Sequence, residues 1–276
     1  MEQTAGPVGV FDSGYGGLTI LRQIRRMMPH YDYLYLGDNA RAPYGTRSFD
    51  IVYEFTLQAV RHLFGCGCPL VILACNTASA KALRTIQQRD LPRIDPRRRV
   101  LGVIRPTVEV VGDVSKSRHV GIMATPGTIR SRTYELEIAK LCPDIQVTGE
   151  ACPMWVPLVE NEEYDSPGAD YFVRQRIENL LRRDPDIDTV ILGCTHYPLL
   201  LGKIRQYMPP GIHIIEQGGY VAESLKDYLA RHPDMEQHIT RGATARFLTT
   251  EQTETFRQKA VTFMGEQLCA EKVCLR

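Results

Sequence analysis

The chain has 276 residues, with 33 Lys and Arg against 32 Asp and Glu, and 43% of its residues are hydrophobic. The net charge of +1 leaves no basic excess to neutralise a phosphate backbone, so nucleic acid is not expected as a partner. No apolar run reaches the roughly 18 residues that cross a bilayer, and residues 1–4 lack signal-peptide character, so we expect a cytoplasmic globular protein without a membrane partner.

Short β-branched apolar runs alternate with stretches of helical periodicity, which is typical of parallel strands joined by crossover helices. The predicted strands span residues 8–11, 31–36, 70–74, 100–104, 120–124, 145–148, 189–192, 212–215 and 246–248. The predicted helices span about 16–28, 48–65, 77–89, 106–116, 127–141, 168–183, 199–208, 219–231 and 251–267. We therefore predict a doubly wound α/β fold with mainly parallel sheets.

Two α/β domains are expected rather than one, because this many strands would make a large single sheet. The charged stretch 93–99 is interpreted as a solvated connector. A weak internal repeat supports the division, since residues 71–75 and 190–194 share the pattern Val-Ile-Leu-small-Cys. Segments 9–14 and 121–126 also match, each as a strand followed by a hydroxyl residue and a turn breaker. Two related, pseudo-symmetric units facing each other would bring both strand ends to a single cleft.

The eight cysteines are expected to be free thiols, because disulfide frameworks are uncommon in cytosolic chains of this length. No C-x-x-C occurs, and Cys66-Gly-Cys68 has no second half at zinc-ligand spacing, so we expect no metal. Six thiols are interpreted as structural, namely Cys66, Cys68, Cys142, Cys152, Cys269 and Cys274. The other two differ in position.

Cys75 and Cys194 each end a predicted buried strand, which is where ligands bind in open parallel sheets. The residues that follow, 76–77 and 195–196, are polar types that begin helices. A helix N-terminus lowers the pKa of a thiol from its usual value of about 8.5, so this position favours a reactive thiolate. His196 is the one histidine that adjoins such a thiol.

The glycine-rich turn after the first strand, residues 12–17, admits two interpretations. Its glycines can bring backbone amides close to a small carboxylate, with Ser13 adding a hydroxyl. The alternative is a nucleotide site, but Thr19 stands where the dinucleotide fingerprint needs a glycine, and Asp12 would lie beside the phosphate. Asp38 ends the second strand as a ribose-binding acid would, which keeps this alternative open.

Segments 38–45 and 152–161 have loop character and carry usable polar groups, among them Tyr44 and Glu160. Two facing thiols without a metal or redox motif suit acid–base chemistry on both faces of a carbon, where one thiolate removes a proton and the opposite thiol returns one. The alternative is a single nucleophilic cysteine, as in a glutaminase-type amidase, with His196 as its base. The near-symmetric pair favours the first hypothesis.

Five motifs, taken in order, resemble those of the bacterial glutamate racemases, in the cofactor-independent aspartate/glutamate racemase superfamily. They are 9–18 (GVFDSGYGGL), 38–45 (DNARAPYG), 74–79 (ACNTAS), 124–128 (ATPGT) and 193–199 (GCTHYPL). The resemblance implies interconversion of L- and D-glutamate, supply of D-glutamate for peptidoglycan, no cofactor and a homodimer. It also implies two domains that sandwich the substrate, with the C-terminal segment returning to the first, so that residues 1–97 and 212–276 form one domain and 98–211 the other.

By this resemblance, Cys75 and Cys194 are the two catalytic acid–base residues, one for each enantiomer. Asp12 and His196 would assist them, with Glu160 near the second thiol. The implied substrate contacts are Asp12, Ser13, Tyr44, Gly45, Asn76, Thr77, Thr125, Thr128, Thr195 and His196. With no pyridoxal to delocalise the carbanion, backbone amides and hydroxyls must stabilise the developing charge electrostatically.

Some positions depart from the pattern of the family. Arg105 stands where an acidic residue is usual, and Gln217-Gly218-Gly219 replace Asp-Ser-Gly. These departures bear on helix packing, regulation or subunit contacts rather than on the reaction. A racemase for aspartate or another acidic amino acid, and a ligand-binding protein without activity, stay open as alternatives.

Overall fold

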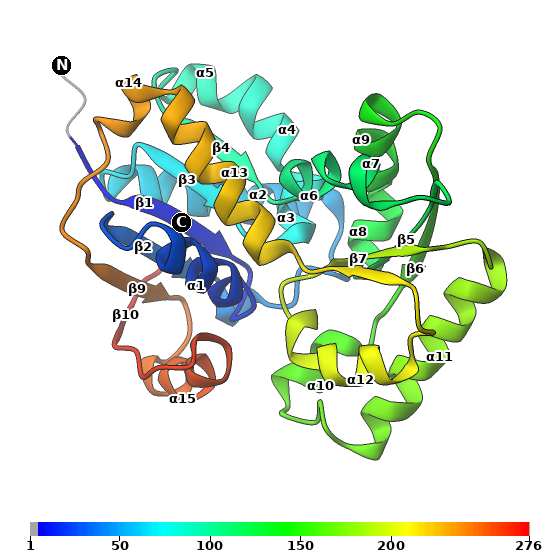
Figure 1. Ribbon diagram of the computed structural model, residues 1–276. Helices are drawn as coiled ribbons and strands as arrows, with labels where there is room; N and C mark the ends of the chain where they lie inside the picture. Colours follow the sequence, from blue (N-terminus) through cyan, green and yellow to red (C-terminus); the bar gives the residue numbers. More distant parts are fainter. Residues whose placement is uncertain (1–4, 276) are drawn as a thin grey trace. The chain divides into compact units, whose positions relative to one another are not determined.

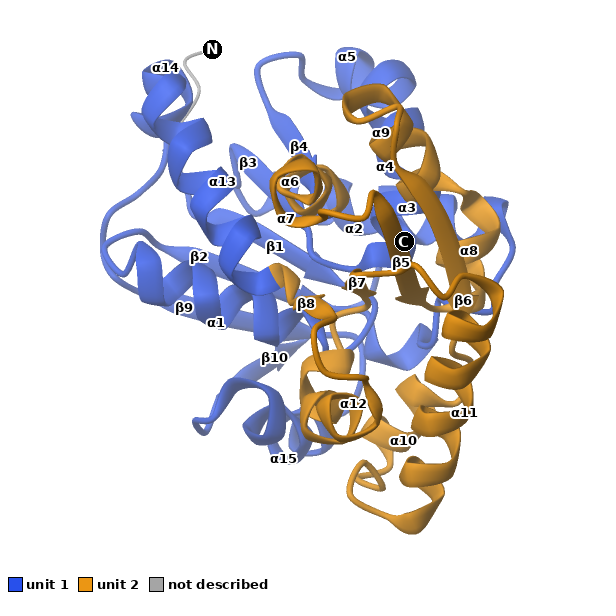
Figure 2. Cartoon of the chain, turned by 45° about the vertical axis from the view of Figure 1, so that its right-hand side comes forward, with its two compact units in different colours: residues 1–103, 218–276 blue, residues 104–217 orange. Residues whose placement is uncertain are grey.

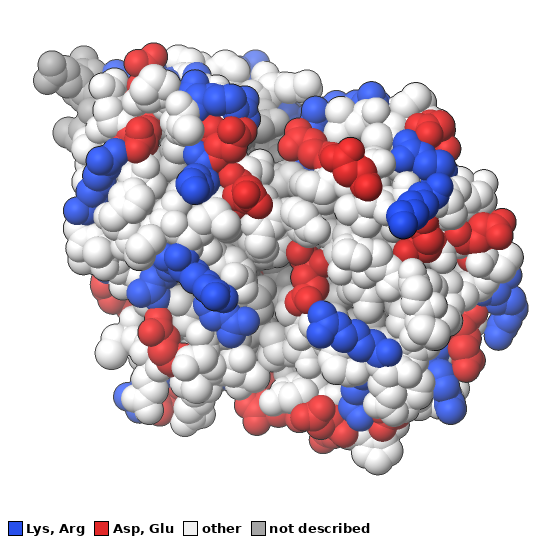
Figure 3. All heavy atoms as spheres, viewed as in Figure 1, with Lys and Arg blue, Asp and Glu red and all other residues white. Residues whose placement is uncertain are grey.

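The computed structural model describes residues 5–275 and has the predicted α/β class, with two parallel sheets (Figure 1). Residues 1–4, from which we expect no signal peptide, lie outside the described part of the chain. Within that part, no helix combines the length and the apolar character needed to cross a membrane. On the face drawn in Figure 3, Lys and Arg side chains are interspersed with Asp and Glu, in keeping with the net charge of +1.

The chain forms two compact units (Figure 2). Unit 1 comprises Met1–Val103 with Gly218–Arg276, and unit 2 comprises Ile104–Gln217. These limits differ from the predicted boundaries after residues 97 and 211, because two short strands join the sheet that precedes them. β4 (Arg99–Gly102) pairs with β3 (Leu70–Leu73), and β8 (His213–Ile215) pairs with β7 (Thr189–Gly193). Each boundary therefore falls after a strand instead of before it.

Unit 1 contains a six-stranded parallel sheet in the order β10-β9-β2-β1-β3-β4. Its remaining strands are β1 (Val8–Asp12), β2 (Tyr33–Gly37), β9 (Ala245–Thr249) and β10 (Ala270–Lys272). Every residue of β1, β2 and β3 is buried, as expected of central strands whose two faces are both covered by helices. The continuous apolar runs in the sequence follow from this double burial.

The helices of unit 1 are shorter and more numerous than the periodicity predicts. They are α1 (Gly17–Met27), η1 (Asn39–Arg41), α2 (Phe49–Gly65), α3 (Asn76–Lys81), α4 (Leu83–Thr85), η2 (Ile86–Asp90), α5 (Leu91–Ile94), α13 (Gln217–Arg231), α14 (Pro233–Glu236) and α15 (Thr253–Met264). The single helix predicted over 77–89 is divided, because the chain changes from α to π geometry at Ile86. Helix α15 packs on α1, and the ring of Phe263 stacks 5.9 Å from that of Tyr15, so the C-terminal segment completes unit 1.

Unit 2 contains a four-stranded parallel sheet in the order β6-β5-β7-β8. Its other strands are β5 (His119–Ala124) and β6 (Gln146–Ala151). Its helices are α6 (Ile104–Glu109), α7 (Val111–Val114), α8 (Pro126–Ser131), α9 (Thr133–Leu141), α10 (Trp155–Glu160), α11 (Pro167–Arg183), η3 (Tyr197–Leu200) and α12 (Leu201–Tyr207). Each sheet therefore has two adjacent inner strands, β1 with β3 and β5 with β7, whose carboxyl ends lie at the same edge.

Further local predictions also differ from the structure. The helix predicted over 127–141 is divided because Arg132 has a φ of 55°, the left-handed region that ends α8. The segment 152–161, predicted as a loop, contains α10. The charged stretch 93–99 is tied to unit 1, since the Arg98 guanidinium donates to the carbonyls of Phe64 and Cys68. The arginines of this stretch hold the start of β4 rather than forming a free connector.

Candidate active site

Cys75 lies at the junction of β3 and α3 and is 5% exposed. It is itself the N-cap of α3, a role that the sequence pattern gives to the residues after it. Its Sγ accepts a hydrogen bond from the backbone N–H of Ala78 at 3.4 Å and lies 3.3 Å from Ser13 Oγ. Amide and hydroxyl donors around a sulfur stabilise negative charge on it. Asn76 and Thr77, both buried, form the first turn beside it.

Asp12 and Ser13 reach the same edge because β1 is the neighbour of β3. The Asp12 carboxylate is fully buried and accepts the backbone N–H of Gly14 at 2.9 Å. Gly17 permits this turn, since a Cβ there would lie 2.4 Å from the Cβ of Asp12. The backbone N–H of Gly14 thus donates to Asp12 within the protein, whereas the sequence predicts that backbone amides of this turn lie close to the carboxylate of a ligand.

Tyr44 is fixed by Asp38, a residue that is fully buried. One oxygen of Asp38 accepts the Tyr44 hydroxyl and Arg41 Nε, and the other accepts Thr250 Oγ1 at 2.9 Å. Burial, with the charge of Asp38 in addition, raises the pKa of Tyr44 far above its usual value, so its phenol stays neutral. Asp38 is thus fully buried and holds Tyr44, Arg41 and Thr250 together, which fits a structural anchor better than the ribose ligand of the nucleotide alternative. Gly45, also buried, follows Tyr44 in this segment.

Cys194 follows β7 and is 6% exposed, but its surroundings differ from those of Cys75. The chain makes a turn here and continues into η3, so no α-helix begins at this thiol. Instead, His196 Nδ1 lies 3.9 Å from the Cys194 sulfur, and His196 Nε2 lies 3.0 Å from Glu160 Oε1. Thr195, 4% exposed, stands between the thiol and the imidazole in sequence.

The imidazole of His196 is buried between two groups that favour its protonated form. Burial lowers its pKa, but the hydrogen bonds and charges of Cys194 and Glu160 outweigh this and raise the pKa to about 10. The ring is therefore an imidazolium at neutral pH, able to hold a thiolate at Cys194 and to return a proton to it.

Glu160 comes from the last turn of α10, which the only tryptophan holds in place. Trp155 is fully buried, its ring lies 4.7 Å from that of Tyr197, and its Nε1 donates to the carbonyl of Phe172 at 3.3 Å. The Tyr197 hydroxyl donates to the carbonyl of Cys152 at 3.4 Å. This packing connects α10 to the residue directly after His196, so it brings Glu160 to the imidazole.

Thr125 and Thr128 lie at the carboxyl end of β5, the neighbour of β7. Thr125 is the N-cap of α8, and its Oγ1 accepts the backbone N–H of Thr128 at 3.2 Å and lies 3.1 Å from the Thr128 hydroxyl. Ala124 is paired in register with Gly193, which precedes Cys194. Two hydroxyls therefore stand at the same sheet edge as the thiol of unit 2.

Residue pattern alone did not select two further side chains of unit 2, Tyr134 and Gln217. Tyr134 is 3% exposed and packs against Gly193, and Gln217 donates to its hydroxyl at 2.8 Å. The departure of Gln217 from the family pattern was the available signal in the sequence.

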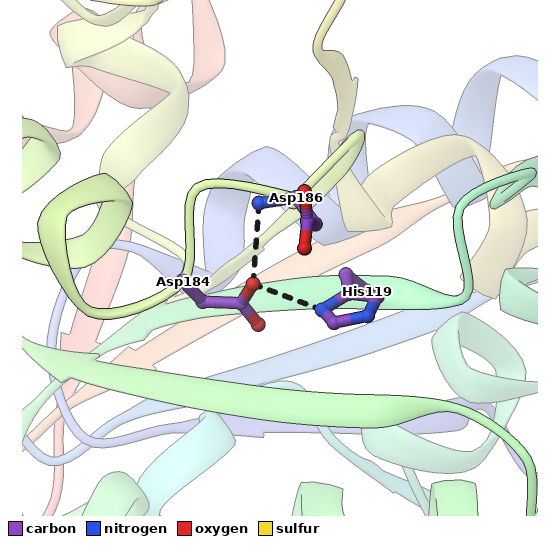
Figure 4. A group of neighbouring side chains, drawn as sticks. All are labelled: His119, Asp184 and Asp186. Carbon is purple, nitrogen blue, oxygen red and sulfur yellow. Dashed lines mark hydrogen bonds and ion pairs between the residues drawn. The ribbon is translucent and has the colours of Figure 1, made fainter.

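One group of potential metal ligands, His119, Asp184 and Asp186, lies at the opposite end of the unit 2 sheet (Figure 4). Asp184 Oδ1 is 2.9 Å from His119 Nδ1, and Asp184 Oδ2 accepts Thr148 Oγ1 at 3.1 Å. His119 is the first residue of β5, and Gln146, the first residue of β6, also donates to Asp184 Oδ2 at 3.3 Å. Asp184 thus joins the amino ends of two strands, which is a structural role.

Comparisons with known proteins agree with this geometry. Residues 18–224 match the Asp/Glu/Hydantoin racemase family, and a glutamate racemase of Cereibacter sphaeroides is 40% identical over 274 residues, covering 96% of this chain and 98% of that protein. A glutamate racemase isoform from Bacillus anthracis has a TM-score of 0.88 at 33% identity, covering 98% of both chains. A glutamate racemase from Francisella tularensis, in complex with D-glutamate, has a TM-score of 0.86 at 30% identity, also covering 98% of both chains. The resemblance predicted from the five motifs is confirmed, and the chain belongs to the Asp/Glu/hydantoin racemase family.

Proposed function

We propose that this protein interconverts L- and D-glutamate by proton transfer at Cα between two cysteine thiols, without a cofactor. The observation that carries the proposal is the pair of buried thiols, Cys75 and Cys194, each at the carboxyl end of an inner strand of its sheet and each with its own polar partners. We infer that the substrate is glutamate because a relative named as a glutamate racemase is 40% identical over 96% of this chain.

The reaction proceeds in two proton transfers. In one direction the Cys194 thiolate takes the α-proton, which forms its S–H bond and leaves the electron pair on Cα. Cys75, as a thiol, then gives its proton to the opposite face and becomes the thiolate. In the other direction the two sulfurs exchange roles. Before a second turnover in the same direction, each sulfur returns to its starting protonation state by proton exchange with solvent. The His196 imidazolium stabilises the thiolate of Cys194, and the Ser13 hydroxyl stabilises the thiolate of Cys75. Asp12 assists on the Cys75 side.

The carbanion is the costly species, because the α-proton of an amino acid is far less acidic than a thiol. We infer that the substrate carboxylates are held by the buried polar residues at the two sheet edges. These are Ser13, Tyr44, Gly45, Asn76, Thr77, Thr125, Thr128, Thr195 and His196. Donors already fixed by the fold need no reorganisation when charge builds up on the α-carboxylate, which is the main source of rate in such sites.

The two-thiol reaction requires both sulfurs to act on the same Cα. We further propose that the product serves as D-glutamate for peptidoglycan, that the protein is cytoplasmic, and that it forms a homodimer. Light scattering of the purified protein tests the last point, and a monomer at all concentrations would remove it.

The purified chain should abolish the circular dichroism of either glutamate enantiomer without an added cofactor, and should exchange the α-hydrogen in heavy water. The exposed-thiol variant Cys269→Ser is the matched control and should keep both signals. An intact fold that shows neither signal with glutamate contradicts the proposal. A higher kcat/KM with aspartate than with glutamate would keep the chemistry and change the substrate.

A second candidate function is an amidase with one nucleophilic cysteine. The contacts from Cys194 to His196 and from His196 to Glu160 favour this function, because the three groups are arranged in the order of a Cys–His–carboxylate triad. Such an enzyme would release ammonia from glutamine and would keep its rate in Cys75→Ser. It gives no reason for the buried thiol of Cys75 with its own donors, so we place it second.

A further inference from the structure

Gln217 makes a buried two-way connection in unit 2. It is 2% exposed, and its Nε2 donates to the Tyr134 hydroxyl at 2.8 Å and to Thr107 Oγ1 at 2.9 Å. These partners lie 83 and 110 positions away in the sequence. The connection therefore joins Gln217, the last residue of unit 2, to α9 and to α6.

The direction of these hydrogen bonds follows from the chemistry of the amide. A side-chain NH₂ group has two hydrogens and can only donate, so both hydrogens of Gln217 are used by its two partners. The Tyr134 oxygen is an acceptor toward Gln217, which turns the phenolic hydrogen away from the amide. Burial, with the charge of Cys194 in addition, raises the pKa of Tyr134 far above its usual value, so the phenol keeps this hydrogen.

Tyr134 packs against the backbone of Gly193, the residue directly before Cys194. Its Cε2 is 3.2 Å from the position that a Cβ on Gly193 would occupy, and Gly193 is bonded directly to Cys194. A Cβ at residue 193 would press on this ring and on the Cβ of Ala124, 3.1 Å away, so glycine suits the close approach. We therefore expect the hydrogen bond from Gln217 to the Tyr134 hydroxyl to influence the position of the ring and of residue 194.

We propose that Gln217 is a positioning residue for Cys194, acting through Tyr134. Its hydrogen bond holds the phenolic oxygen, and with it the ring that contacts Gly193. This inference rests on the proposed racemisation, and it assigns to the departure at residue 217 an effect on one of the two proton transfers.

The test is the primary isotope effect on kcat/KM with α-deuterated L-glutamate and with α-deuterated D-glutamate. Gln217→Met removes both donors at nearly constant volume, and we expect kcat to fall about 3- to 10-fold, as for the loss of the one neutral hydrogen bond to Tyr134. The transfer at Cys194 then limits the rate more strongly. The isotope effect should rise for the enantiomer that Cys194 deprotonates and fall for the other.

Two variants make this outcome specific. Tyr134→Phe should reproduce the opposed change, and it replaces Gln217→Met if that variant does not fold. Thr107→Val removes the other acceptor of Gln217 and should leave the ratio of the two isotope effects as in the wild type. Equal changes with both enantiomers, or unchanged isotope effects with a lowered kcat, would overturn the inference. A wild type that exchanges no α-hydrogen of glutamate would instead overturn the proposed function.

Discussion

The surroundings of Cys75 and of Cys194 differ more than the matching strand ends suggest. Cys75 caps a helix, accepts a backbone amide and lies beside the Ser13 hydroxyl, both neutral groups. Cys194 follows a strand into a turn and lies beside an imidazole whose pKa is raised by Cys194 itself and by Glu160. The internal repeat therefore preserves the backbone position of the thiol but not the means of stabilising its charge.

This difference has a consequence for the reaction. A hydroxyl or an amide keeps its proton at all relevant pH values, whereas an imidazolium can lose its proton. The Cys194 side should be the more sensitive of the two to pH and to single substitutions. The predictions below test that asymmetry, beginning with the largest effect.

Replacing either thiol should remove racemisation. Cys75→Ser and Cys194→Ser should each lower kcat on the order of 10²- to 10⁴-fold or more, because an alcohol is a far weaker acid than a thiol. Loss of circular dichroism from each glutamate enantiomer measures this. Racemisation at an unchanged rate in either variant would show that one thiol suffices.

The partners of the two thiols should contribute unequally. His196→Gln removes a charged donor worth about 1.5–3 kcal/mol and should lower kcat about 10- to 100-fold. Ser13→Ala removes a neutral donor worth about 0.5–1.5 kcal/mol and should lower kcat about 2- to 10-fold. Steady-state rates of the two variants compare the sides directly, and a larger loss in Ser13→Ala would reverse the asymmetry.

Glu160→Gln should move the ionisation of His196 to lower pH. A raised pKa in the folded state gives stability that is fully present below the unfolded value of about 6.5 and is lost as pH rises through the folded value of about 10. Without the carboxylate, the alkaline loss of kcat/KM and of unfolding free energy should begin at lower pH. Profiles measured between pH 6 and 10 test this.

The matched control for that experiment is Glu163→Gln, which removes an exposed carboxylate three residues further along. Its profile should coincide with that of the wild type. If both variants shift equally, the effect comes from net charge and not from the contact with His196.

One aspartate in each unit holds the start of a strand in place. Its replacement should affect stability but not the difference between the Cys75 and Cys194 sides. Asp188, before β7, accepts four hydrogen bonds from residues 115–117 and Thr189, which outweigh its burial and lower its pKa to about 2. Asp32, before β2, is held by the segment 240–244, and its pKa is lowered to about 2 in the same way. Asp188→Asn and Asp32→Asn should each lower the unfolding free energy by about 1–3 kcal/mol at neutral pH.

Denaturant unfolding measures this loss. The depressed pKa gives stability that is present above the unfolded value of about 3.9 and is lost as pH falls toward about 2, so the variants should unfold with a flatter acid dependence. An altered ratio of the isotope effects in Asp188→Asn would show that the start of β7 also influences Cys194.

The class of fold and the edge of each sheet could be predicted, because buried parallel strands are continuous apolar runs and their carboxyl ends are marked by polar residues. Cys75, Cys194 and Ser13 are found in this way. The break at Arg132 could not be predicted, since a single non-glycine residue in the left-handed region leaves no pattern. Helix α10 was missed because its six residues include Pro157 and are too few to show a helical period.

Contacts between distant segments are the other part that the sequence does not reveal. Asp38 was interpretable as a ribose ligand until its oxygens were seen to be engaged by Tyr44, Arg41 and Thr250. Gln217 reaches Thr107 across 110 positions, and nothing in local composition predicts that meeting. The pattern identifies the reactive thiols, whereas tertiary packing decides what surrounds each of them.

Exchange of the α-hydrogen in heavy water, followed separately for L- and D-glutamate, tests the two-thiol account most directly. The wild type should exchange the α-hydrogen of both enantiomers. Cys75→Ser and Cys194→Ser should each retain exchange with one enantiomer only, and with opposite enantiomers. Exchange of both enantiomers by either variant, or retention of the same enantiomer by both, would contradict the assignment of one thiol to each face of the substrate.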